Sequence, residues 1–178
     1  MMKRFIILDR DGVLNEDSKD YIKAPDEWRP IPRSLEAVKL LNEKGYEVVV
    51  ATNQSGLARN YYDEKTLEAI HQKMRDALHE KGAHLAGIFY CPHGPEDSCL
   101  CRKPKPGLLH QIQEAFQISL AQTPFVGDSR RDLDAAITAG AKPILVRTGN
   151  GSKTLEKEPS LAAEIPVFED LYAFALSL

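Results

Sequence analysis

The sequence has few cysteines, no long apolar run and no excess of one charge. Its three cysteines all lie between positions 91 and 101, which argues against a disulfide framework across the chain. No stretch approaches the roughly 20 apolar residues of a membrane-spanning helix, and the apolar part of residues 1–8 is too short for a secretory signal. The 23 basic and 26 acidic residues are scattered, which excludes a nucleic-acid surface built by bulk charge.

The overall composition is that of a globular protein. Hydrophobic residues make up 43% and charged residues 28% of the 178 positions, and no repeat or low-complexity stretch interrupts them. A chain of this length buries enough surface to fold as one domain without disulfides. We therefore expect a single domain, residues 1–178, that is monomeric and cytoplasmic and binds neither nucleic acid nor a membrane.

Short apolar runs alternate with longer segments of helical period, a pattern typical of a parallel sheet covered by helices. The predicted strands are residues 5–8, 48–51, 88–90, 125–126 and 144–146. The predicted helices run from Ser34, as N-cap, to Gly45; from Asp63 to Gly82; from Pro106 to Phe116; from Arg131 to Gly140; and near 168–176. Right-handed crossovers then predict an α/β fold with an open, doubly wound, mostly parallel sheet.

Two carboxylates follow the first predicted strand. Asp9 and Asp11 come directly after it, with Gly12 next in the chain. Ligands of doubly wound sheets bind at the carboxyl ends of the strands, so both side chains are expected in one cleft. Such a pair can hold Mg²⁺, or can divide the roles of nucleophile and proton donor. The alternative is a solvated turn, since Asp and Gly are common turn residues.

Three more polar segments follow later strands or lie beside them. Residues 52–56 offer small hydrogen-bond donors for phosphate oxygens, and residues 127–132 add acidic groups at the same edge of the sheet. Arg102 and Lys103 supply cations for a phosphoryl group. Taken singly, each segment is explained as well by a polar loop, a helix cap or surface charge. The order of the segments along the chain makes the set specific.

In this order, the four segments resemble the four motifs of the haloacid dehalogenase superfamily of aspartate-dependent phosphatases, and the resemblance covers nearly the whole chain. It implies that Asp9 attacks phosphorus, while Asp11 protonates the leaving oxygen and later activates water. It also implies that Thr52 and Lys103 hold the phosphoryl oxygens. The implied Mg²⁺ ligands are the side chain of Asp9, the backbone carbonyl of Asp11 and the side chain of Asp128, with Asp132 in support.

A second set of metal ligands lies in residues 91–101. These eleven residues contain three sulfurs and one imidazole, the ligand set of a closed tetrahedral zinc site: Cys91, His93, Cys99 and Cys101. Free thiols beside a surface histidine are the alternative, but they leave so dense an arrangement without a purpose. With no open coordination position, the zinc is expected to be structural.

This zinc loop, followed directly by Arg102 and Lys103, is similar to the superfamily branch that contains heptose bisphosphate phosphatases and histidinol-phosphate phosphatases. The stretches D-R-D-G-V-L-N, T-N-Q-S-G-L-A-R and C-R-K-P-K-P-G are close to the heptose enzymes. The resemblance implies removal of the 7-phosphate of D-glycero-D-manno-heptose 1,7-bisphosphate, in the synthesis of activated heptose for lipopolysaccharide core or related glycans. Arg102 is then expected to bind the far phosphate, and the other expected pocket residues are Asp17, Tyr21, Asn53, Gln54, Ser55, Gly56 and Arg59.

Two features depart from the heptose branch. The five-residue spacer between His93 and Cys99 is short, and Ser129 stands where a basic residue is expected. A histidinol-phosphate phosphatase with the same catalytic residues is the first alternative, and an inactive zinc-stabilised binding or scaffold protein is the second. No interval between the motifs is long enough for a cap domain, so specificity is expected to come from loops. Residues 17–32 are the expected wall opposite the zinc loop; a connection packed by its aromatic residues is the alternative.

Overall fold

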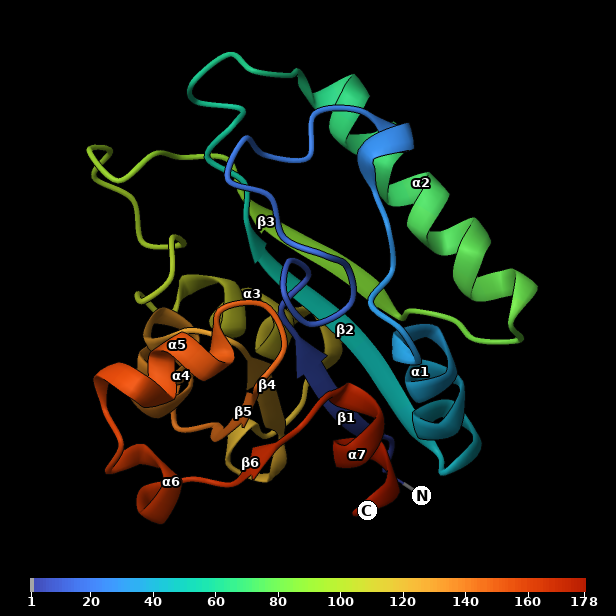
Figure 1. Ribbon diagram of the computed structural model, residues 1–178, viewed down its shortest axis with the longest axis vertical. Helices are drawn as coiled ribbons and strands as arrows, with labels where there is room; N and C mark the ends of the chain where they lie inside the picture. Colours follow the sequence, from blue (N-terminus) through green and yellow to red (C-terminus); the bar gives the residue numbers. More distant parts are fainter. Residues whose placement is uncertain (1) are drawn as a thin grey trace.

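A six-stranded parallel sheet forms the centre of the computed structural model, which describes residues 2–178 (Figure 1). The strand order is β3-β2-β1-β4-β5-β6, and every neighbouring pair is parallel. The predicted doubly wound α/β fold is confirmed, although the prediction contained five strands rather than six. The strands are β1 (Arg4–Leu8), β2 (Tyr46–Asn53), β3 (Gly87–Cys91), β4 (Pro124–Gly127), β5 (Lys142–Val146) and β6 (Val167–Phe168).

Helices cover both faces of the sheet (Figure 1). One face is covered by α1 (Ser34–Glu43), α2 (Glu64–Glu80) and α7 (Leu171–Leu176), and the other by α3 (Gly107–Phe116) and α4 (Arg130–Ala139). Beside β5, α4 packs with α5 (Gly151–Lys157) and α6 (Leu161–Glu164), and two 3₁₀ turns lie at Pro25–Glu27 and Leu120–Gln122. None of the helices within residues 2–178 has both the length and the apolar character needed to cross a membrane.

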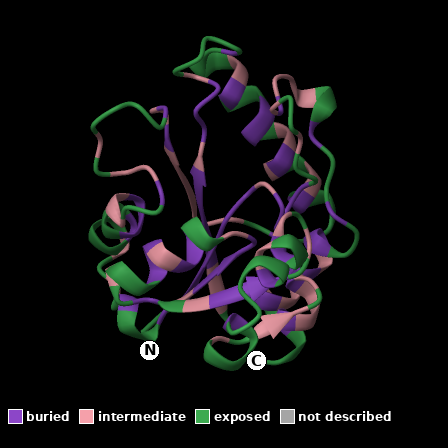
Figure 2. Ribbon diagram, turned by 60° about the vertical axis from the view of Figure 1, so that its left-hand side comes forward, coloured by how far each residue is buried: buried purple, intermediate pink, exposed green. Residues whose placement is uncertain are grey.

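The side chains of β1 show why both faces must be covered. Ile6 and Leu8 pack with α1, α2 and α7, while Phe5 and Ile7 pack with α3 and α4, because successive side chains of a strand alternate between faces. All four are buried, and Figure 2 shows burial concentrated on the strands and the inward sides of the helices. Full burial of one such side chain contributes about 1.5–3 kcal/mol. An unbroken apolar run is therefore the sequence of a central parallel strand.

The helix boundaries follow the predictions, with one wrong cap. Asp63 caps α2 by accepting a hydrogen bond from the backbone N–H of Thr66 at 2.8 Å, so this helix begins where it was predicted to begin. The prediction that Ser34 caps α1 is wrong, because Ser34 is the first helical residue and makes no capping bond. Its hydroxyl instead donates to the carbonyl oxygen of Leu14 at 2.6 Å. That bond ties the start of α1 to the loop after β1.

The tail after β5 contains more structure than its sequence predicts. The helix expected near 168–176 is α7, which begins after Asp170; this residue accepts a hydrogen bond from the backbone N–H of Ala173 at 2.7 Å. The additional elements are α5, α6 and β6. β6 pairs with β5 through two residues and forms the edge of the sheet, away from β1.

The strand order reverses at β1, which lies between β2 and β4. In open α/β sheets such a reversal leaves a crevice at the carboxyl ends of the strands. Asp9 follows β1, and Asp128 follows β4. The backbone N–H of Asp9 donates to the carbonyl oxygen of Val126 at 2.9 Å, which fixes the exit of β1 against β4. The fold thus brings the two aspartates to one crevice.

Candidate active site

A cavity of about 280 Å³ lies at the carboxyl ends of β1, β2 and β4. Most of the site residues predicted from the sequence line it: Asp9, Asp11, Asp17, Tyr21, Asn53, Gln54, Ser55, Arg102, Lys103, Asp128 and Asp132. Three others, Thr52, Gly56 and Arg59, are not among its lining residues. The loops after the strands therefore converge as the topology requires.

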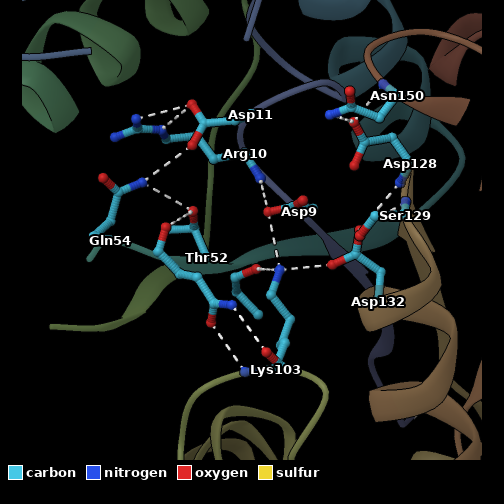
Figure 3. A network of polar contacts seen from close by, with 12 residues as sticks. Asp9, Arg10, Asp11, Thr52, Gln54, Lys103, Asp128, Ser129, Asp132 and Asn150 are labelled. Carbon is cyan, nitrogen blue, oxygen red and sulfur yellow. Dashed lines mark hydrogen bonds and ion pairs between the residues drawn. The ribbon is translucent and has the colours of Figure 1, made fainter. Parts of the chain in front are cut away.

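Asp9 provides a buried carboxylate with a cation beside it. Its Oδ1 accepts a hydrogen bond from the backbone N–H of Arg10 at 2.8 Å and lies 3.0 Å from Lys103 Nζ (Figure 3). Burial, followed by repulsion from Asp132, raises the pKa of Asp9 well above its ordinary value, and Lys103 opposes that rise. A carboxylate so placed can act as a nucleophile when further positive charge is present.

Lys103 is a buried cation surrounded by three oxygens. Its Nζ lies 3.0 Å from Asp9 Oδ1 and 2.8 Å from Asp132 Oδ1, and it donates to the carbonyl oxygen of Ala51 at 2.9 Å. Burial alone would lower the pKa of Lys103, but Asp132 and Asp9 raise it above its ordinary value. Asn53 holds the backbone of Lys103 through two hydrogen bonds, of 3.0 and 3.1 Å. The cation is therefore fixed before any phosphate arrives.

Asp132 fixes the loop that carries Asp128. Its Oδ2 accepts hydrogen bonds from the backbone N–H of Asp128 at 3.1 Å and from the backbone N–H and hydroxyl of Ser129 at 3.2 and 3.0 Å. Burial alone would raise the pKa of Asp132, but Lys103 and these donors hold it below its ordinary value. Asp132 thus supports the loop that carries Asp128, and its part in metal binding stays a prediction.

Asp9, Asp128 and Asp132 form a carboxylate cluster that fits Mg²⁺. Their carboxylate oxygens lie within 4.8 Å of one another. The backbone N–H of Asn150 donates to Asp128 Oδ2 at 2.8 Å, and Gly12, with φ of +84°, leaves room there that a side chain would fill. Burial, followed by repulsion from Asp132, raises the pKa of Asp128 to about 7, although the N–H of Asn150 and the charge of Lys103 oppose that rise. Since Asp132 is engaged by its own donors, Asp9 and Asp128 are the side chains available to a hard cation.

The carboxylate of Asp11 lies apart from that of Asp9, on the lining of the same cavity (Figure 3). Its Oδ1 accepts hydrogen bonds from Arg10 Nε and Nη2 at 3.1 and 2.9 Å and from Asn15 Nδ2 at 2.9 Å. Its Oδ2 lies 3.3 Å from Gln54 Nε2, and the side chain remains 24% exposed. The Asp11 carboxylate is therefore separate from the carboxylate cluster, and metal coordination through its backbone carbonyl stays a prediction.

The end of β2 and the turn after it both line the cavity and support it. Thr52 is fully buried, and its hydroxyl accepts a hydrogen bond from Gln54 Nε2 at 3.0 Å, while Tyr62 donates to Gln54 Oε1 at 2.6 Å. Gly56 packs against the ring of Tyr62, where a side chain would collide, and Arg59 is exposed. The predicted roles of Thr52, Gly56 and Arg59 in binding phosphate or substrate stay predictions.

Residues 17–22 form another wall of the cavity. Asp17 Oδ2 accepts a hydrogen bond from Asn150 Nδ2 at 3.1 Å, and the ring of Tyr21 packs edge-on against Tyr61 with centroids 5.1 Å apart. Trp28, farther along the segment, is buried in the core. The segment is thus both a wall of the site and a connection packed by its aromatic residues.

Besides Arg10, two arginines line the same cavity. Arg102 follows the zinc ligands, and Arg131 lies in the first turn of α4. Neither forms an ion pair with any of residues 2–178. Burial, followed by repulsion from Arg131, lowers the pKa of Arg102. Ser129 leaves the position after Asp128 without a cation, and Arg131 supplies one two residues later.

The four predicted zinc ligands lie together at the end of β3 and in the loop after it. The donor atoms of Cys91, His93, Cys99 and Cys101 are all within 4.8 Å of one another. The Cys91–Cys99 sulfur separation of 3.9 Å matches the edge of about 3.8 Å expected for a zinc tetrahedron, while the Cys91–Cys101 separation is shorter at 2.9 Å. Burial raises the pKa of the Cys91 thiol to about 12, so its thiolate form needs a neighbouring cation. The donor set fits structural zinc.

Several supporting residues are missing from the predicted site: Arg10, His71, Tyr62, Asn150 and Arg131. Arg10 and His71 are each 1% exposed, and Arg10 Nη1 lies 3.2 Å from His71 Nε2. The sequence contained one signal for this pair: His71 falls on the apolar face of its helix with Leu67 and Met74. A histidine on that face is buried, and a buried imidazole needs a hydrogen-bond partner such as Arg10.

Comparisons with known proteins identify the family of the chain. The HAD-hydrolase-like family model matches residues 100–174. Over 178 residues the chain is 52% identical to the D-glycero-beta-D-manno-heptose-1,7-bisphosphate 7-phosphatase of Pseudomonas aeruginosa, covering 100% of this chain and 99% of that protein. The crystal structure of D,D-heptose 1,7-bisphosphate phosphatase from B. bronchiseptica, complexed with magnesium and phosphate, gives a TM-score of 0.94 at 52% identity, covering 98% and 97% of the two chains. The chain therefore belongs to the heptose-1,7-bisphosphate 7-phosphatase family of HAD-like, magnesium-dependent phosphatases.

Proposed function

We propose that the protein removes the 7-phosphate of D-glycero-β-D-manno-heptose 1,7-bisphosphate in the synthesis of activated heptose. The proposal rests on the lining of one cavity. A buried carboxylate lies there beside a lysine, and two arginines without ion pairs lie elsewhere on the same lining. The relatives' names support the sugar, the phosphate position and the β anomer. Histidinol phosphate, the substrate of the alternative reading, offers only one phosphate to these cations.

The first half of the reaction transfers the phosphoryl group to Asp9. A carboxylate oxygen of Asp9 attacks phosphorus, the bond between phosphorus and the C7 oxygen breaks, and Asp11 gives its proton to that oxygen. Lys103, 3.0 Å from Asp9 Oδ1, stabilises the oxygens of the phosphoryl group in transfer. Bound Mg²⁺ supplies positive charge that reduces the repulsion between Asp9 and the phosphate.

The second half regenerates the carboxylate. A water molecule attacks the phosphorus of the aspartyl phosphate, Asp11 accepts a proton from that water, and the bond between phosphorus and the Asp9 oxygen breaks. Inorganic phosphate leaves, and Asp11 is again protonated for the next cycle. Splitting one displacement into two makes each step easier than direct attack by water.

The far phosphate gives the substrate its orientation. In a site without a cap, few walls surround the sugar, so a second phosphate is a strong handle. Arg102 and Arg131 can each bind phosphate oxygens through a planar fork, and their mutual repulsion is relieved by a dianion between them. Arg102→Ala should lower kcat/KM for the bisphosphate about tenfold or more, and that for p-nitrophenyl phosphate by less than about threefold. Arg75→Ala, a change at an exposed arginine of α2, is the matched control.

The test of the substrate is phosphate release over sugar bisphosphates, sugar monophosphates and histidinol phosphate with added Mg²⁺. ³¹P NMR of the heptose bisphosphate reaction should show loss of the 7-phosphate signal and retention of the 1-phosphate signal. Preferential hydrolysis of histidinol phosphate would replace the proposal with the alternative function. Absence of turnover on every phosphate ester would favour the scaffold protein.

A further inference from the structure

A buried chain of polar contacts leads from the centre of α2 to the carboxylate of Asp11. Arg10 lies at its middle and is 1% exposed. Its Nε and Nη2 donate to Asp11 Oδ1 at 3.1 and 2.9 Å, and its Nη1 lies 3.2 Å from Nε2 of His71, which is also 1% exposed. Nothing in the reaction described above uses His71.

The hydrogen-bond donors of Arg10 fix the protonation state of His71. A guanidinium group has only hydrogen-bond donors, so Nε2 of His71 must be the unprotonated nitrogen of a neutral ring. Burial, followed by the charge of Arg10, lowers the pKa of His71 to about 3, so the imidazole stays neutral across the working range of an ordinary enzyme. His71 is therefore a fixed acceptor on a rigid helix rather than a proton carrier.

The same contacts distinguish the two oxygens of Asp11. Oδ1 accepts three hydrogen bonds, two from Arg10 and one from Asn15 Nδ2, whereas Oδ2 has a single longer contact of 3.3 Å to Gln54. A proton on Oδ1 would face donors that cannot accept it. The transferable proton is thus confined to Oδ2, and the orientation of Oδ1 decides where that proton points.

We propose that His71 is a positioning residue for the general acid: by holding Arg10, it fixes Asp11 so that Oδ2 delivers the proton to the leaving oxygen. The inference rests on the role of Asp11 given under the proposed function. His71→Phe keeps a flat ring on the helix but leaves Arg10 Nη1 as a buried donor without its acceptor. Arg10 then has no fixed position, and small misplacements of a catalytic group are costly.

The test depends on the leaving group. An alkoxide must be protonated as it leaves, whereas p-nitrophenolate is a stable anion and leaves without help. His71→Phe should therefore lower kcat/KM about tenfold to a hundredfold for the alkyl phosphate turned over fastest in the substrate screen, and less than about threefold for p-nitrophenyl phosphate. His71→Gln, which restores an acceptor oxygen, should recover most of the loss. His84→Phe changes an exposed histidine and is the matched control.

Arg10→Lys tests the next contact in the chain, because it keeps the charge but loses the fork on Asp11, and it remains informative if His71→Phe does not fold. The same selective loss on the alkyl phosphate is expected. Equal losses on both substrates, or no loss on either, would overturn the inference for His71. Retention of alkyl phosphate turnover by Asp11→Asn would instead remove the acid role of Asp11, and with it both the proposed mechanism and this inference.

Discussion

Replacing Lys103 with methionine should destabilise the fold, because it leaves two buried carboxylates without their shared cation. Lys103 Nζ lies 3.0 Å from Asp9 and 2.8 Å from Asp132, and the exposed fractions of the three side chains are 3%, 13% and 2%. Removing one partner of a buried ion pair costs about 3–5 kcal/mol. At about 2–4 °C per kcal/mol for a chain of this size, the melting temperature should fall by about 6–20 °C.

The size of that loss should depend on pH. In the wild-type protein Lys103 opposes the effect of burial and holds the pKa of Asp132 below its ordinary value. Without Lys103, burial raises the folded-state pKa above the unfolded value of about 3.9. Between these two pKa values the folded variant binds more protons than its unfolded chain. Its free energy of unfolding therefore falls as pH rises from the unfolded-state pKa of Asp132 to the folded-state pKa. The difference from wild type should be larger at about pH 8 than at about pH 5.

Thermal denaturation of both proteins in magnesium-free buffer, followed by circular dichroism at the two pH values, measures this effect. Lys65→Met is the control, because Lys65 is exposed on α2 and should be replaceable with little change. A fall of less than about 2 °C in Lys103→Met, or a larger loss at the lower pH, would refute the electrostatic reasoning.

Three further outcomes follow from the same geometry. Asp9→Asn should abolish phosphate release with an unchanged circular dichroism spectrum, and a rate above about a hundredth of wild type would contradict covalent catalysis. Cys99→Ser should reduce zinc below one ion per chain by elemental analysis and lower the melting temperature; unchanged values would leave the cysteines without a structural role. Mg²⁺ affinity by calorimetry should fall below about pH 7, because burial raises the pKa of Asp128 to about 7 and protons then compete; constant affinity would contradict this.

The central strands could be predicted because their apolar runs are buried on both faces. The apolar side chains of β1 and β2 pack against helices on both faces of the sheet, so their apolar runs do not alternate with polar residues. Few other structures give this sequence pattern. β6 could not be predicted in the same way, since it contains two half-buried residues after Pro166. The short helices α5 and α6 each bury one leucine, Leu155 and Leu161, so neither carries an apolar stripe that a sequence pattern detects.

The residues that approach phosphate were easier to predict than the residues that hold them in place. Asp9 and Asp128 each follow a strand, and topology alone directs both to one edge of the sheet. Arg10 stands between two aspartates, a sequence context typical of a solvent-exposed charge, although its side chain is buried. Its partner His71 comes from α2, and only the path of the chain back over the sheet places that helix beside it. Local spacing therefore contains no information about that pair.

The formal charges around Asp9 favour Mg²⁺ binding before the substrate. Three buried carboxylates and the ammonium of Lys103 leave the floor of the site at minus two, and a phosphate dianion brought there first would be repelled. Burial and repulsion between the carboxylates raise the pKa values of Asp9 and Asp128, so protons and a metal cation compete for these oxygens. A divalent ion held by Asp9 and Asp128 would offset the charge of the floor and favour the ionised form of both carboxyls. Mg²⁺ binding would thus favour the nucleophilic form of Asp9 and the approach of phosphate together.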